Sequence, residues 1–213
     1  AAAYTAVDLA ETEVEKAFLV NADGTENLAE ACAENNAQFI HVSTDYVFDG
    51  ENNLAYTEED FTNPLGVYGA SKLAGDELAL EVNPCSVILR TSWVYSEFGK
   101  NFVKTMLNLF ATKEELSIVA DQFGQPTNAN DLAEAIMKII KSEKITPGIF
   151  NFSNLGRISW FDFAEKIAEL SEAKIKLNAI ETSQYPTPAK RPKNSVLDLD
   201  KISKTYGIQL KPW

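Results

Sequence analysis

Short apolar segments alternate along this chain with longer segments of helical periodicity, and this alternation limits the folds that it can adopt. Residues with the apolar spacing of helices are 13–35, 70–81, 101–111, 131–141 and 160–170. Residues that read as strands are 38–42, 86–89, 116–119, 149–152 and 175–180, with the end of another at 1–4. Strands that alternate with helices indicate an α/β fold with a parallel, doubly wound sheet. Asn130 and Ser159 are predicted to cap the last two helices.

The composition fits a folded protein and excludes several classes of function. The chain has 213 residues, of which 45% are hydrophobic and 23% charged, enough for a substantial core. Its net charge of −12 disfavours nucleic acid, which is bound through Lys and Arg. No apolar run reaches the roughly 18 residues of a membrane span, and no secretory leader is visible. We therefore predict a cytoplasmic protein that binds neither nucleic acid nor membrane.

Cysteine and histidine are too few for zinc or hydrolase chemistry. Cys32 and Cys85 read as buried apolar side chains in a reducing compartment. A structural zinc site needs about four ligands, so no metal site is predicted. His41 is the only histidine and lies inside a predicted strand, which favours a packing role. A Ser-His-Asp hydrolase would have to use it, which disfavours that class.

The segment from Tyr68 to Lys72 reads Tyr-Gly-Ala-Ser-Lys and has the layout of a reduction site. Tyr68 and Lys72 are four residues apart, so on a helix they share one face. A free tyrosine has a pKa of about 10, and a nearby positive charge lowers it toward the operating pH. In a chain of this composition, about half a Tyr-x-x-x-Lys match is expected by chance. The alternative interpretation of this segment is a surface tyrosine beside a solvated lysine.

The surroundings of this segment favour the functional interpretation. Ser43 and Thr44 stand at the C-terminal end of the strand predicted over 38–42, which is where open α/β sheets bind their ligands. Residues 63–66 read Asn-Pro-Leu-Gly, a turn just before Tyr68. We therefore expect Thr44, Tyr68 and Lys72 to meet at one end of the sheet.

Several longer motifs resemble those of a known family. Residues 21–28 resemble the Asn-x-x-Gly-Thr-x-Asn-Leu helix of extended short-chain dehydrogenases/reductases. Residues 43–50 read Ser-Thr-Asp-Tyr-Val-Phe-Asp-Gly and resemble the signature of the dTDP-4-dehydrorhamnose reductases, whereas sugar epimerases tend to read Ser-Ser-x-x-Val-Tyr-Gly here. Further matches to that reductase family are residues 1–8, 68–72, 90–95, 101–106, 121–127 and 191–195. The resemblance therefore covers almost the whole chain.

The resemblance implies a Rossmann-type doubly wound sheet with a smaller α/β substrate-binding cap. The family binds the dinucleotide phosphates on a Gly-rich turn, and this turn is not found here, because the 10 glycines are scattered. We therefore expect the N-terminal βαβ units to be missing, and Pro212-Trp213 resembles the lead-in to a further helix. Residues 1–142 are predicted to be the remainder of the NAD(P)-binding domain with some cap segments interleaved, and residues 143–213 mainly the cap.

The activity that the resemblance implies is reduction of dTDP-4-dehydro-6-deoxy-L-mannose to dTDP-L-rhamnose with hydride from NADPH or NADH. Tyr68 would donate the proton to the 4-keto oxygen, and Thr44 would hydrogen-bond that oxygen. Lys72 would hold the nicotinamide ribose and lower the pKa of Tyr68, and Asn21 would anchor a water that relays protons to it. The implied cofactor-binding residues are Ala2, Ala3, Tyr4, Thr5, Ser43, Tyr68 and Lys72. The choice between NADPH and NADH, and any use of Mg²⁺, cannot be read from these residues.

The same resemblance implies a substrate site. Asp45 and Tyr46 would touch the sugar, although Tyr46 equally suits core packing. Trp93 would stack on the sugar or the thymine ring, with a core tryptophan as the alternative. Arg191 suits a diphosphate because its planar fork donates two parallel hydrogen bonds. The implied substrate-binding residues are Thr44, Asp45, Tyr46, Tyr68, Trp93, Asn101 and Arg191, with Lys104, Lys190 and Lys193 as further basic side chains.

Two other functions stay open. The regulatory β subunit of methionine adenosyltransferase resembles this family and acts by binding a partner enzyme. Another nucleotide-sugar reductase or epimerase would share the same machinery, and a fold alone does not separate them. The retained Thr44, Tyr68 and Lys72 favour an enzyme whose partner is a dTDP-sugar. A homodimer stays open.

Overall fold

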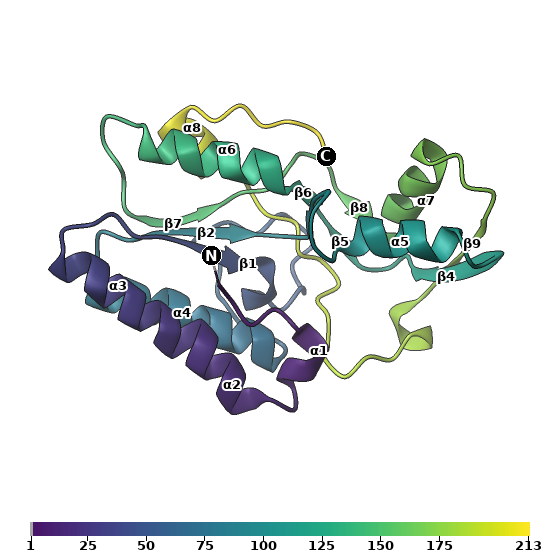
Figure 1. Ribbon diagram of the computed structural model, residues 1–213, viewed down its shortest axis with the longest axis horizontal. Coiled ribbons are helices and arrows are strands. Elements are labelled where there is room, and N and C mark those ends of the chain that lie inside the picture. Colours follow the sequence, from purple (N-terminus) through teal and green to yellow (C-terminus); the bar gives the residue numbers. More distant parts are fainter. Residues whose placement is uncertain (1) are drawn as a thin grey trace.

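A three-stranded parallel sheet forms the centre of the protein in a computed structural model, which describes residues 2–213. Its order is β1 (Ile40–Thr44), β2 (Val87–Thr91) and β7 (Gly148–Asn151), and both neighbouring pairs run parallel. Helices α3 (Gly24–Glu34) and α4 (Val67–Val82) lie on one face. Helices α6 (Ala129–Ile140) and α8 (Asp200–Tyr206) lie on the other (Figure 1). The predicted α/β fold with a parallel sheet covered on both faces is confirmed.

The central strand β2 explains why the sheet is covered on both faces. Successive side chains of a strand point to opposite faces, and all five of its residues are buried. Val87 and Leu89 join the core beneath α6 and α8, whereas Ile88 packs with Ala29 and Ala79 of the helices on the other face. Strands that are buried on both faces carry continuous apolar runs, as residues 87–89 of this strand do before Arg90 and Thr91.

A second, smaller group of elements packs around aromatic side chains. Strands β4 (Glu115–Val119) and β9 (Lys176–Ile180) pair in parallel, and α5 (Phe102–Phe110) and α7 (Trp160–Leu170) pack against each other (Figure 1). Two short pairs, β3 (Val94–Tyr95) with β6 (Thr127–Asn128) and β5 (Phe123–Gly124) with β8 (Ile158–Ser159), lie between the two groups. The predicted cap at Ser159 is confirmed, because Ser159 and Asp162 form a reciprocal capping box.

The two groups exchange segments along the chain. α5 and β4 precede residue 143 but pack with α7 and β9. β7 and α8 follow that residue, but β7 is a strand of the central sheet and α8 packs on that sheet. The division into residues 1–142 and 143–213 stays a prediction. The exchange means that the chain crosses between the groups several times, so a site at their junction draws on distant parts of the sequence.

The helix expected over residues 13–35 is interrupted. α1 (Val7–Ala10) comes first, and then α2 (Val14–Phe18) runs through a π-helical turn at Leu19–Asp23 into α3. π-Turns inside α-helices are rare and often mark functional sites. This one carries Asn21, whose buried side chain accepts a hydrogen bond from the backbone N–H of Tyr4 and donates one to its carbonyl.

Several expectations from the sequence are wrong. Residues 2–4 form no strand, because Asn21 takes up the backbone groups of Tyr4, and Ala1 lies outside the described residues. The cap of α6 is Asn128, whose side chain accepts from the backbone N–H of Asn130. Helix α8 was not predicted. Cys32 is only half-buried and Cys85 is exposed, since both lie where α3 and α4 end at the surface.

Two kinds of feature are absent from the part of the chain that the structure describes. None of its helices combines the length and the apolar character needed to cross a membrane. No group of three or more His, Cys, Asp or Glu side chains between residues 2 and 213 is arranged to hold a metal ion.

Gly69 allows α4 to begin directly against the chain that follows β1. A Cβ atom at this position would lie 2.2 Å from the carbonyl oxygen of Tyr46, which is backbone and cannot turn away. We expect Gly69→Ala to lower the free energy of unfolding by about 1–3 kcal/mol, the usual cost of overpacking. Chemical denaturation measures this change.

Gly24→Ala is the matched control. Its nearest non-neighbouring atom, the carbonyl oxygen of Leu19, would be 3.4 Å from the new Cβ. Replacing a helical glycine by alanine gains about 0.5–1 kcal/mol where there is room, so this variant should be neutral or more stable. Equal stability of Gly69→Ala and the parent would contradict the close approach of α4 to Tyr46.

Candidate active site

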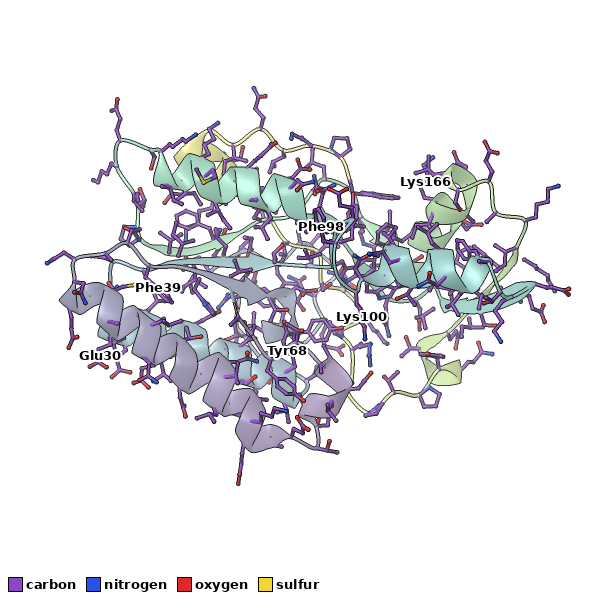
Figure 2. The ribbon with its side chains drawn as sticks, viewed as in Figure 1. Glu30, Phe39, Tyr68, Phe98, Lys100 and Lys166 are labelled. Carbon is purple, nitrogen blue, oxygen red and sulfur yellow. The ribbon has the colours of Figure 1, made fainter. Side chains whose placement is uncertain are left out.

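Tyr68 and Thr44 meet at the C-terminal end of β1. Thr44 is the last residue of the strand, and a short 3-10 helix (Asp45–Val47) follows it at once. Tyr68 lies in the first turn of α4, and its ring contacts the ring of Tyr46 edge to face, with centroids 5.6 Å apart. Figure 2 shows Tyr68 where α1 and α4 come together. The structure thus brings Tyr68 beside Thr44, as expected from the sequence, with Tyr46 next to them.

The phenol of Tyr68 does not have the lowered pKa that the sequence suggested. Burial raises the pKa of Tyr68 to about 12, and the Thr44 hydroxyl acts only partly against that rise. Burial also raises the pKa of Tyr46. The expectation was wrong because it counted the charge of Lys72 and left out the loss of water around the phenol. A raised pKa keeps Tyr68 protonated near neutral pH, which is the state that a proton donor needs.

Lys72 is buried beneath the site and already has partners. Its ammonium nitrogen Nζ lies 2.8 Å from Nε2 of His41 and donates to the carbonyl oxygen of Val42 at 2.8 Å. The side chain belongs to α4 and is almost fully buried. Burial lowers the pKa of Lys72 to about 8, and the carboxylate of Asp76 acts against that shift. The contact with His41 was missed at the sequence level.

A group of buried polar side chains stands behind Lys72. Asp76 Oδ2 accepts from the Ser43 hydroxyl at 2.9 Å and from Arg90 Nε at 3.3 Å. Asp76 Oδ1 and Arg90 Nη1 are buried without a hydrogen-bond partner in the described structure. Asp76 lies one helical turn after Lys72, and that spacing was the signal in the sequence that could have revealed it. The predicted place of Ser43 beside a cofactor stays a prediction, since its hydroxyl is directed to Asp76.

The segment predicted to run beside a cofactor is fixed at one point only. Tyr4 is buried, packs in one apolar cluster with Val67 and Tyr68, and is held by Asn21. Asn21 also donates to the Ser71 hydroxyl of α4 at 3.0 Å. The neighbouring residues Ala2, Ala3 and Thr5 are exposed. Asn21 therefore joins the segment to the helix that carries Tyr68, and the water relay predicted for it stays a prediction.

A cavity of about 440 Å³ lies in the second group of elements. Its wall is largely apolar and aromatic, with a few polar groups toward the C-terminal tail. The lining side chains are Phe102, Thr105, Met106, Leu109, Leu116, Ser117, Ile118, Val119, Gln122, Trp160, Tyr185, Thr187 and Arg191. Apolar cavities with a few convergent polar groups are typical of small-molecule sites. Of the predicted substrate residues, Arg191 lines this cavity.

Arg191 is held in place by a second charge. Its guanidinium donates two bonds to Asp8, at 3.0 Å to Oδ1 and 2.9 Å to Oδ2, and a third to the carbonyl of Ala189. This pairing holds the pKa of Asp8 below its usual range. Asp8 lies in α1, so the pair ties the C-terminal tail to the start of the chain near Tyr4 and Tyr68. Bidentate arginine pairs fix orientation as well as contributing energy.

Trp93 and Asn101 serve local structure. The indole of Trp93 stacks on Trp160 with centroids 3.5 Å apart, and a Cβ on Gly124 would lie 2.5 Å from the same ring, so the packing alternative describes the contacts seen. Asn101 caps α5 by accepting from the backbone N–H of Lys104. Their predicted contacts with substrate stay predictions. Asp45 is buried beside Thr44, which donates to it at 3.0 Å, and burial raises the pKa of Asp45 to about 6.

Comparison with known proteins gives a consistent result. The whole chain, residues 1–213, matches the family described as the RmlD substrate binding domain. It is 49% identical over 221 residues to a dTDP-4-dehydrorhamnose reductase of Sinorhizobium fredii, covering 100% of this chain and 75% of that protein. The chain thus spans about three quarters of the length of this relative.

Solved structures agree. A dTDP-4-dehydrorhamnose reductase from Clostridium acetobutylicum superposes with a TM-score of 0.95 at 42% identity, covering 99% of this chain and 74% of the other. A dTDP-4-dehydrorhamnose reductase from Bacillus anthracis, solved in complex with NADP, gives a TM-score of 0.94 at 40% identity with the same coverage.

Proposed function

The chain belongs to the RmlD substrate-binding domain family, and we propose on this basis that it reduces dTDP-4-dehydrorhamnose to dTDP-L-rhamnose. One observation in the structure carries the proposal. A threonine and a protonated tyrosine meet at the C-terminal end of a parallel strand, with a buried lysine one helical turn behind the tyrosine. That arrangement supports proton delivery to a carbonyl oxygen.

The cofactor of the proposal is NADPH or NADH, since a relative 40% identical to this chain was solved with NADP. The residues present fit its nicotinamide end. The exposed small side chains of Ala2 and Ala3 leave the backbone open beside Tyr4 and Tyr68. Lys72 is buried in the same helix as Tyr68, with His41 and Val42 as its present partners, and we propose that its charge acts there on the site. When bound, the reduced cofactor supplies the hydride to the carbonyl carbon.

Each residue of the chain has a separate task in the proposal. Tyr68 transfers its phenolic proton to the 4-keto oxygen. The Thr44 hydroxyl, which donates to Asp45 in this structure, turns to donate its hydrogen bond to the same oxygen when substrate is bound. Tyr68 begins protonated because burial raises its pKa to about 12. The positive charge of Lys72 favours the phenolate that remains after transfer, because opposite charges at short range stabilise each other. Asp45 and Tyr46 border the sugar.

The nucleotide part of the substrate is assigned to the cavity. Its aromatic and apolar wall suits a thymine ring, and Arg191 at its edge suits the diphosphate. The pair with Asp8 holds the guanidinium in one orientation.

Two further parts of the proposal concern the setting. The two cysteines are both free, which supports the reducing cytoplasm as the place of the reaction. Leu19 and Leu28 are 62% and 61% exposed on the helical segment from α2 to α3, which supports a homodimer. Light scattering on the purified protein measures the oligomeric state.

Tyr68→Phe tests the acid. We expect turnover to fall by about 10²- to 10⁴-fold, because the phenol alone supplies the proton. The assay follows NADPH oxidation with dTDP-4-dehydrorhamnose generated in situ, and calorimetry follows dTDP-rhamnose binding, which should persist.

Tyr206→Phe is the control for this experiment, since it removes the same hydroxyl from α8 on the opposite face of the sheet. Its turnover should stay near that of the parent. Retained turnover in Tyr68→Phe would show that another group is the acid. A folded parent that oxidises neither NADPH nor NADH with this substrate would overturn the proposed reaction and favour a regulatory or a different nucleotide-sugar function.

Arg191→Gln tests the nucleotide site. We expect the dissociation constant for dTDP to rise about tenfold or more, the loss of a hydrogen bond to a charged group. Asp8 is left unpaired but is 43% exposed, so the fold should tolerate the change. Calorimetric titration with dTDP measures the effect. Lys166→Met removes one exposed positive charge from α7 and should leave dTDP affinity unchanged; equal affinities for all three proteins would refute the assignment.

A further inference from the structure

His41, the single histidine of the chain, contacts the ammonium of Lys72 directly. Its Nε2 lies 2.8 Å from Lys72 Nζ, and the neighbouring carbonyl of Val42 accepts from the same nitrogen. His41 is an inner residue of β1, three positions before Thr44, and its side chain is 11% exposed. Two consecutive residues of the strand therefore offer two acceptors to one lysine of α4.

The charge states decide which group donates. Burial and the charge of Lys72 lower the pKa of His41 to about 3, so the imidazole is neutral near pH 7. Lys72, with a pKa of about 8, is then mainly an ammonium and has no acceptor lone pair. The alternative donor bond, from His41 Nε2 to Asp76 Oδ1, spans 3.8 Å and is too long. His41 must therefore carry its proton on Nδ1 and accept through Nε2.

Asp76 is the carboxylate that acts on the charge of Lys72. It is almost fully buried, lies one turn further along α4, and is itself fixed by Ser43 and Arg90. Its free oxygen Oδ1 faces His41 at 3.8 Å. The ammonium is thus placed by two acceptors on the strand and by one negative charge on its own helix.

We propose that His41 is a positioning residue, which accepts a hydrogen bond from Lys72 and holds its ammonium at the base of the active site in a fixed direction. The inference deepens the proposed function and rests on it, because Lys72 acts there on Tyr68. A buried imidazole nitrogen needs a hydrogen-bond partner in any role, and here that partner is the ammonium of Lys72. The packing contact of His41 is separate, a stack on Phe39 with ring centroids 6.0 Å apart.

The proposal has a consequence for the pH dependence of turnover. His41 on β1 contacts Lys72, and Asp76 on α4 is the carboxylate that acts on its charge. Arg90 on β2 pairs with Asp76, and Tyr68 lies one turn earlier on α4. An acceptor for the ammonium favours its charged form, so removal of the imidazole lowers the pKa of Lys72. Activity that needs the ammonium is lost as the pH rises through that pKa. The alkaline limb of the kcat profile therefore moves to lower pH.

His41→Phe and His41→Gln form the matched pair of variants. Phenylalanine keeps the stack on Phe39 and removes the acceptor, whereas glutamine keeps an acceptor oxygen on the side chain. We expect His41→Phe to lower kcat about tenfold through misplacement of Lys72, and to move the alkaline limb down by about one pH unit. The KM for the dTDP-sugar should stay unchanged, since His41 does not line the cavity. His41→Gln should recover most of both losses.

Phe39→Leu separates packing from positioning. It disturbs the stack but leaves the imidazole, so its pH profile should match that of the parent. A shift in Phe39→Leu equal to that in His41→Phe, or a parent-like profile in His41→Phe, would overturn the proposal. A rise in KM in His41→Phe with kcat unchanged would also overturn the proposal.

A measurement without turnover keeps this inference apart from the proposed function. ¹⁵N NMR of the parent should show a neutral His41 with its proton on Nδ1, identified by the absence of its signals in His41→Phe. In Lys72→Met the pKa of His41 should rise, because the neighbouring positive charge is gone. An Nε2–H tautomer, or the same titration in Lys72→Met as in the parent, contradicts the contact. If the contact is confirmed in a protein that has no reductase activity, the proposed function is overturned and the contact between His41 and Lys72 stands.

Discussion

The burial of three charges between α4 and the first two strands is the constraint on which the site depends. Lys72, Asp76 and Arg90 are each at most 2% exposed, and a buried charge without partners is costly. Their contacts with each other and with His41, Val42 and Ser43 leave α4 little freedom to slide along the sheet. Since Tyr68 is one turn from Lys72, the same contacts set its distance from Thr44. Removing one of these three side chains would leave the other two buried without their partner.

Close backbone approach supports this arrangement from the other side of α4. A Cβ on Gly69 would meet the carbonyl of Tyr46, and one on Gly75 would lie 2.1 Å from the carbonyl of Asn21. The helix is therefore pressed between the end of β1 and the π-helical turn. The turn directs the Asn21 side chain at both Tyr4 and Ser71. The irregular start of the chain is thereby tied to the catalytic helix without any strand pairing.

The sequence predicted what depends on local spacing. Alternating apolar segments located the strands of the sheet, Ser159 located the start of α7, and the Tyr68-to-Lys72 spacing correctly placed both residues on one helix. It missed what depends on tertiary burial. Lys72 was expected to lower the pKa of Tyr68, but the phenol and the ammonium both lose water, and that loss dominates each pKa. His41 was expected only to pack, because no local pattern shows that a lysine 31 residues away will point at it.

In the proposed reaction, the positions of Tyr68 and Lys72 together explain how a phenol that is a poor acid can donate the proton. A phenol with a pKa of about 12 holds its proton firmly, which prevents loss to solvent but resists transfer. Transfer becomes easier only as far as a positive charge favours the phenolate, and such a charge acts strongly in a site from which water is excluded. The ease of proton transfer then depends on where the ammonium lies as well as on its presence. A lysine held by a strand carbonyl and an imidazole keeps that position, whereas a solvated lysine would spread its charge over many rotamers.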